Sequence, residues 1–166
     1  MKRDNKIQTL KIQTLIAKAS SSPELLDRLL RVAEAPERHY GRMILGPEDA
    51  AAAFSPLLQG LVEEATAVLA VDIKNRALSS SILARGSSRW SLVDPHQILA
   101  WAFRQGPTGA HKIFLAHNHP SGDLTPSAQD RDVTRKVRLA CEAAGIPLLD
   151  HLIITDEGFS SVMAWL

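Results

Sequence analysis

The stretch from His117 to Asp130, HNHPSGDLTPSAQD, restricts the fold of this chain more than any other part of its sequence. His117 and His119 are two positions apart, so on a strand their imidazoles point to the same face. The Pro-Ser-Gly that follows is typical of a turn. Thr125, which precedes a proline, fits the N-cap of a helix. The stretch therefore predicts a strand, a turn and a helix in this order.

The two imidazoles and the carboxylate form a candidate metal site. Asp130 comes eleven residues after His119, which is enough chain to turn and begin a helix that returns the carboxylate toward the imidazoles. Two histidines and one aspartate supply three protein ligands, and a catalytic zinc typically has three with a fourth position for water. A plainer interpretation stays open, because Ser127 and Asp130 also suit a helix N-terminus.

The same residues at the same spacing occur in a known metalloprotease signature. The JAMM motif of JAB/MPN-domain metalloproteases resembles the run His117-x-His119-Pro120 followed by Ser127-x-x-Asp130. The longer string is similar, more narrowly, to the RadC family of bacterial JAB-domain proteins.

Two further segments occur in the order found in the RadC family, DIKNR at 72–76 and LDHLII at 149–154. The resemblance covers about residues 44–166. It implies the JAB/MPN fold, which is cytidine-deaminase-like in architecture. The order of predicted elements independently favours an α/β fold, with a curved mixed sheet flanked by helices.

The JAMM pattern also requires an upstream glutamate, for which Glu63 and Glu64 are candidates. RadC-like sequences usually place this glutamate eight residues before the aspartate of their Asp-x-Lys-Asn segment. Counting back from Asp72 gives Glu64. The family usually has an aromatic residue two positions after the glutamate, where this chain has Thr66, so Glu63 stays open as an alternative.

The resemblance implies a zinc-dependent hydrolase that cleaves peptide or isopeptide bonds in a protein or peptide substrate. His117, His119 and Asp130 would bind the zinc ion. Glu64 would act as general base and then as general acid, and Ser127 would donate a hydrogen bond to the developing oxyanion. Two alternatives remain: a non-catalytic metal-binding interaction module, and an accessory protein associated with DNA repair.

Nucleic-acid processing has weak support. The string His-Asn-His invites comparison with HNH nucleases, which have a further histidine or asparagine about two dozen residues downstream. The next histidine after His119 is His151, and no asparagine follows Asn118, so the spacing differs. The net charge of +1 also argues against strong binding to a polyanion.

A ligating imidazole needs a hydrogen-bond partner on its other ring nitrogen. Asp150, Thr134 and backbone carbonyls are the candidates for this role. His151 is a third imidazole nearby, but we favour the interpretation of Asp150-His151 as a strand-end pair that satisfies backbone groups.

Composition is that of an ordinary globular protein, with 45% hydrophobic and 22% charged residues. The single cysteine, Cys141, cannot form an internal disulfide, which fits a cytoplasmic protein. No apolar run reaches the roughly eighteen residues of a membrane span. The oligomeric state is not predicted.

We expect two parts, an N-terminal arm with a short helix (residues 1–40) and a RadC-like JAB/MPN domain (residues 41–166). The arm contains the duplication KIQTL-KIQTL at 6–15. The expected elements of the second part are helices at 47–61, 95–104 and 129–144, strands at 66–71, 77–84, 113–117 and 148–155, and a short strand or helix at 158–165.

Overall fold

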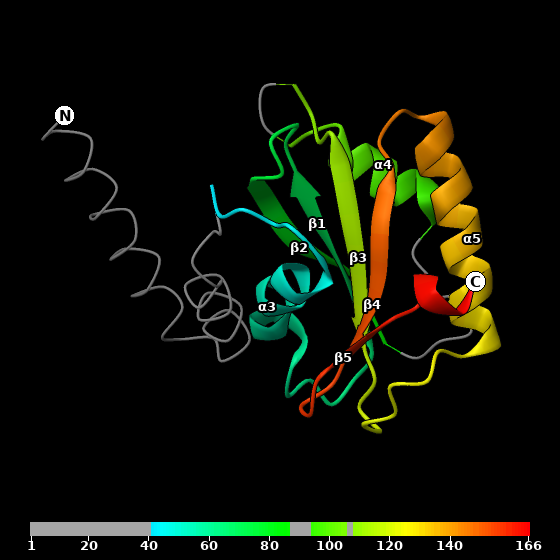
Figure 1. The fold of residues 1–166 in the computed structure, drawn as a ribbon. Coiled ribbons are helices and arrows are strands. Elements are labelled where there is room, and N and C mark those ends of the chain that lie inside the picture. The colour runs from blue at the N-terminus through cyan, green and yellow to red at the C-terminus, as the bar shows by residue number, and fades with distance from the viewer. Residues whose placement is uncertain (1–40, 87–93, 106–107) are drawn as a thin grey trace, which may run out of the picture. The chain divides into compact units, whose positions relative to one another are not determined.

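The computed structural model describes residues 41–86, 94–105 and 108–166. The predicted N-terminal arm and its helix lie outside these residues. The elements, in chain order, are α3 (Pro47–Leu58), β1 (Ala65–Val71), β2 (Ala77–Arg85), α4 (Pro95–Ala102), β3 (Lys112–Asn118), α5 (Ala128–Ala143), β4 (Leu148–Ile154), β5 (Phe159–Ser161) and the 3-10 helix η1 (Met163–Trp165) (Figure 1).

Five strands form one mixed sheet in the order β2-β1-β3-β4-β5. Strand β1 is antiparallel to both β2 and β3, β3 and β4 are parallel, and β5 is antiparallel to β4. Helix α5 connects the two parallel strands, as such a pair requires. The predicted α/β fold with a mixed sheet flanked by helices is confirmed, and it agrees with the JAB/MPN fold that the resemblance implies.

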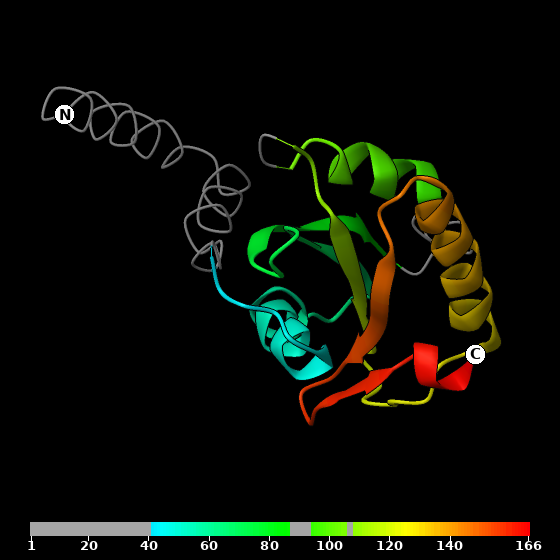
Figure 2. The same cartoon turned by 45° about the horizontal axis from the view of Figure 1, so that its top comes forward.

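Helices cover both faces of this sheet (Figure 2). Strands β1 and β3 are nearly continuous apolar runs because they are buried on both faces. On one face, α3 packs its buried residues against alternate strand residues such as Leu69, Phe114 and Leu152. On the other face, α4 and α5 pack against the intervening residues, among them Val68 and Leu115. The two faces therefore separate odd from even positions of β1.

Most predicted boundaries differ from the observed ones by one or two residues, and α3 is the clearest exception. The prediction that this helix continues to Leu61 is wrong, because it ends at Leu58. Gln59 is extended with ψ 144°, and Gly60 has φ +72°, a conformation that glycine adopts without strain. The last predicted segment contains both a strand and a 3-10 helix.

Cys141 is buried on α5, as expected for a small hydrophobic residue. None of the helices in the described ranges is long and apolar enough to cross a membrane.

We predict that a chain beginning at Gly41 unfolds in one cooperative thermal transition, because the described residues contain both core clusters. Circular dichroism and calorimetry would measure the transition. Loss of cooperative unfolding would contradict this, and would show that residues 1–40 cover part of the core.

Candidate metal centre

Strand β3 and helix α5 bring the three predicted metal ligands together. His117 lies near the end of β3, His119 follows the strand, and Asp130 lies in the first turn of α5. The Nε2 atoms of the two imidazoles are 2.9 Å apart. The carboxylate oxygens of Asp130 lie 3.3 Å from Nε2 of His117 and 3.8 Å from Nε2 of His119. The three side chains form a group that can bind a metal ion.

A capping box fixes the carboxylate of Asp130. The backbone N–H and the hydroxyl of Ser127 both donate to Oδ2 of Asp130, at 2.7 and 2.6 Å. The backbone N–H of Asp130 donates to the Ser127 hydroxyl oxygen at 3.1 Å. The prediction of Thr125 as N-cap is wrong, since the cap is Ser127 and the helix starts at Ala128. The reciprocal bonds between cap and third residue favour this later start.

His119 is held by a backbone carbonyl. Its Nδ1 lies 2.6 Å from the carbonyl oxygen of Asp123. A carbonyl only accepts hydrogen bonds, so Nδ1 carries the hydrogen and Nε2 of the neutral ring presents a lone pair. That lone pair lies on the side of His117 and Asp130. Two ring nitrogens and one carboxylate oxygen are the donor set of many metal sites, so the residues fit a metal ion.

His117 is buried, with 7% of its surface exposed. Burial lowers the pKa of His117 to about 4, although the nearby Asp130 carboxylate acts in the opposite direction. The imidazole is therefore neutral at neutral pH, which is the protonation state that a metal ligand requires.

The sequence analysis did not predict the contact between the side chains of His151 and His117. Nε2 of His151 lies 2.9 Å from Nδ1 of His117, and its Nδ1 lies 2.7 Å from Oγ1 of Thr134. The strand-end interpretation is correct for Asp150, whose carboxylate accepts from the His151 backbone N–H and the Ser161 hydroxyl. It is wrong for the His151 side chain. The strand register explains the contact, because His151 pairs with Leu115 of β3, two residues before His117 on the same face.

Comparison with known proteins agrees with this geometry. The domain described as RadC-like JAB domain matches residues 44–165. The chain belongs to this family. It is 39% identical over 116 residues to a UPF0758 protein of Trichormus variabilis, covering 70% of this chain and 46% of the relative. It is 35% identical over 132 residues to one of Symbiobacterium thermophilum, covering 80% and 54% respectively.

The matched part of the chain thus spans about half the length of these two curated relatives. Their names state no activity. The comparison therefore establishes the family, and the reaction has to be argued from the site.

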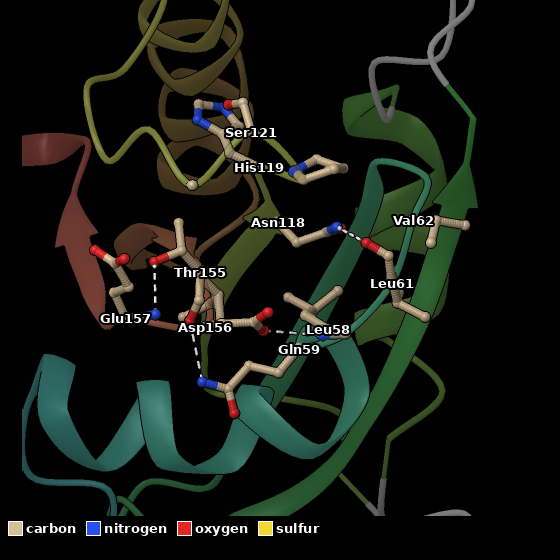
Figure 3. A pocket seen from close by; sticks show the side chains of 14 residues that line it. Leu58, Gln59, Leu61, Val62, Asn118, His119, Ser121, Thr155, Asp156 and Glu157 are labelled. Carbon is tan, nitrogen blue, oxygen red and sulfur yellow. Dashed lines mark hydrogen bonds between the residues drawn. The ribbon is translucent and has the colours of Figure 1, made fainter.

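In this RadC-like domain, Asn118 links β3 to the segment that precedes β1. Its Oδ1 accepts the backbone N–H of Ala65 at 2.7 Å, and its Nδ2 donates to the carbonyls of Glu63 at 3.0 Å and Leu61 at 3.3 Å. Figure 3 shows the Asn118 amide directed at the Leu61 carbonyl. Sequence analysis assigned no role to this residue. Because Asn118 alternates with the two histidines, its side chain faces the α3 side of the sheet.

The two candidate glutamates lie at the surface, next to the segment that follows His119. Glu63 and Glu64 line a pocket of about 420 Å³ together with Pro120 and Ser121. The group of metal-binding side chains does not include either glutamate. A second pocket, of about 500 Å³, is lined by His119 and shares Pro120 and Ser121 with the first (Figure 3).

We predict that Asn118→Ala lowers the free energy of unfolding by about 1–3 kcal/mol, because the buried N–H of Ala65 loses its acceptor. Chemical denaturation would measure the change. Gln59→Ala is a matched control, since Gln59 is exposed and its amide donates once, to the carbonyl of Thr155. The control should change stability by less than about 0.5 kcal/mol. Equal effects of the two substitutions would contradict the role given to Asn118.

Proposed function

We propose that this protein is a zinc-dependent hydrolase of the JAMM type that cleaves peptide or isopeptide bonds. The observation that carries the proposal is the convergence of His117, His119 and Asp130 within a RadC-like JAB domain. Zinc is the proposed metal because two imidazoles and one carboxylate form a three-residue ligand set typical of catalytic zinc. When bound, a zinc ion supplies Lewis acidity, which makes water a nucleophile near neutral pH.

The strand register supports Glu64 as general base. On β1, Ala65 and Ala67 face the α3 side, whereas Val68 faces α5. Thr66 therefore shares the α5 face, and it pairs with His117 of β3. The Gly86 N–H donates to the Glu64 carbonyl at 2.8 Å, so the pairing of β1 with β2 continues to this residue.

Extending the alternation by one step puts Glu64 on the same face as His117, whereas Glu63 lies in the bend before the strand. In the proposed reaction the Glu64 carboxylate accepts a proton from the attacking water. It then returns the proton to the leaving amine.

Ser127 keeps its proposed role as oxyanion donor with one added condition. Its single hydroxyl hydrogen is directed at Asp130, so donation to an oxyanion requires the O–H bond to rotate. Independently of that step, Ser127 orients the carboxylate of Asp130. The substrate is proposed to be a protein or peptide, and the pocket beside His119 offers it space.

The presence of all three candidate ligands argues against a scaffold without a metal, but it is compatible with the alternative of a non-catalytic metal-binding interaction module. The alternative of an accessory role in DNA repair is supported only by the resemblance. The interaction module is an outcome of the experiments below.

We predict that the purified protein binds one zinc ion per chain and that the double substitution His117→Ala/His119→Ala removes it. The reason is that both ring nitrogens of the ligand set are lost. Elemental analysis after dialysis would measure the stoichiometry. A stoichiometry that is unchanged in the double variant would exclude this site.

We predict that Glu64→Gln keeps the zinc and lowers peptide-bond hydrolysis by about 100- to 10,000-fold, the usual contribution of general acid–base catalysis. Glu63→Gln is the matched control, expected to be nearly silent because Glu63 lies in the bend before β1, outside the alternation that assigns Glu64 to the face of His117. Substrates would be found by screening peptides and ubiquitin-like fusions.

If Glu63→Gln abolished hydrolysis and Glu64→Gln did not, the general base would be Glu63 and not Glu64. If neither substitution changed turnover while zinc stayed bound, the JAMM-type mechanism would be wrong. If the zinc-loaded protein cleaved no substrate, the interaction module would be favoured.

A further inference from the structure

A continuous chain of buried side chains leads from helix α5 to the ring of His117. Oγ1 of Thr134 lies 2.6 Å from the backbone carbonyl oxygen of Asp130 and 2.7 Å from Nδ1 of His151. Nε2 of His151 lies 2.9 Å from Nδ1 of His117. Thr134 is fully buried and His151 is 4% exposed. The hydrogens of such a chain can point in one of two directions, and the direction decides where His117 carries its hydrogen.

The carbonyl of Asp130 sets the direction at the first link. A carbonyl oxygen cannot donate, so at 2.6 Å the single hydroxyl hydrogen of Thr134 must point toward it. The hydroxyl oxygen of Thr134 then has only lone pairs to offer to His151. Nδ1 of His151 must therefore carry a hydrogen and donate it to Thr134.

The second link follows from the first. A neutral imidazole has a single N–H, and the contact with Thr134 places the hydrogen of His151 on Nδ1. With that hydrogen on Nδ1, Nε2 of His151 presents a lone pair. It accepts the Nδ1 hydrogen of His117, whose own Nε2 is left with a lone pair on the side of His119 and Asp130.

We propose that Thr134 and His151 are positioning residues that keep the hydrogen of His117 on Nδ1 and so keep Nε2 free to bind metal. In the reverse direction Thr134 would donate to His151, His151 would donate to His117, and the hydrogen of His117 would occupy the metal-binding nitrogen. The proposal rests on the metal site of the proposed function and is independent of which bond the protein hydrolyses.

The hydrogen bond of His119 supports the same position, Nδ1, for the hydrogen of His117. The Nδ1 hydrogen of His119 is directed at the Asp123 carbonyl. When both neutral rings carry their single hydrogen on Nδ1, neither has a hydrogen for the 2.9 Å contact between the two Nε2 atoms. Two lone pairs so close, beside the Asp130 carboxylate, are favourable around a cation, which is what a metal site requires.

Long-range ¹H–¹⁵N NMR spectra of the full-length protein, metal-free and loaded with Zn²⁺, would show which ring nitrogen carries each hydrogen. We expect His151 and His117 to carry theirs on Nδ1 in both states. A dominant Nε2–H form of His151 in the zinc-loaded protein would overturn the proposal, and this measurement needs no variant.

Thr134→Val removes the hydroxyl and nearly preserves the shape of the side chain. We expect it to weaken Zn²⁺ affinity by up to about 10- to 100-fold, the usual range when the hydrogen-bonded group that orients a metal ligand is disturbed, because His151 loses the acceptor that fixes its tautomer. Thr134→Ser keeps the hydroxyl and should restore the affinity. Competition with a chelator would measure the Zn²⁺ affinity of each variant. Unchanged affinity in Thr134→Val would overturn the proposal.

Ser55→Ala is the matched control, because Ser55 also donates its hydroxyl to the carbonyl four residues earlier, that of Ala51 in α3. It should leave Zn²⁺ affinity unchanged. A protein with the expected tautomers and affinities that cleaves no peptide would contradict only the hydrolase proposal. A peptidase with His151 in the Nε2–H form would contradict only the tautomer proposal.

Discussion

The parallel pairing of β3 with β4 is the constraint on which the rest of the site depends. This pairing places His151 on the same face as His117, one strand away. Parallel neighbours need a crossover, and here the crossover is α5, which returns across that same face. The first turns of α5 then carry Asp130 and Thr134 to the imidazoles. One topological requirement therefore supplies the third ligand and the hydrogen-bond partner of the neighbouring histidine.

The alternation of β3 assigns the His-Asn-His string to two tasks. The histidines face α5 and are candidate metal ligands, whereas Asn118 faces the opposite side and binds the backbone of 61–65. That segment carries the two candidate glutamates. The strand thus connects the position of the candidate general base to the position of the candidate ligands, although the two lie on chain segments more than fifty residues apart.

Local patterns predicted much of this structure. The apolar runs of β1 and β3 gave their boundaries within one residue, since burial on both faces leaves an uninterrupted signal. The spacing of His117, His119 and Asp130 predicted their convergence. Two local predictions were wrong, the N-cap of α5 and the end of α3. Ser127, and not Thr125, forms the capping box of α5, and Gly60, with its positive φ, follows the early end of α3. The role of His151 depends on a contact between residues 34 positions apart, and no local pattern reports such a contact.

Each candidate metal ligand is oriented by a different group that is not part of the candidate ligand set. His119 is held by the Asp123 carbonyl, Asp130 by the Ser127 cap, and His117 by the ring of His151. These groups come from a loop, a helix terminus and a strand, so each ligand is fixed by a separate part of the fold. Ligands already oriented in this way lose little conformational freedom when they bind an ion. Folding alone therefore positions the candidate ligands. We expect substitutions of the orienting groups to change metal affinity more than they change the stability of the fold.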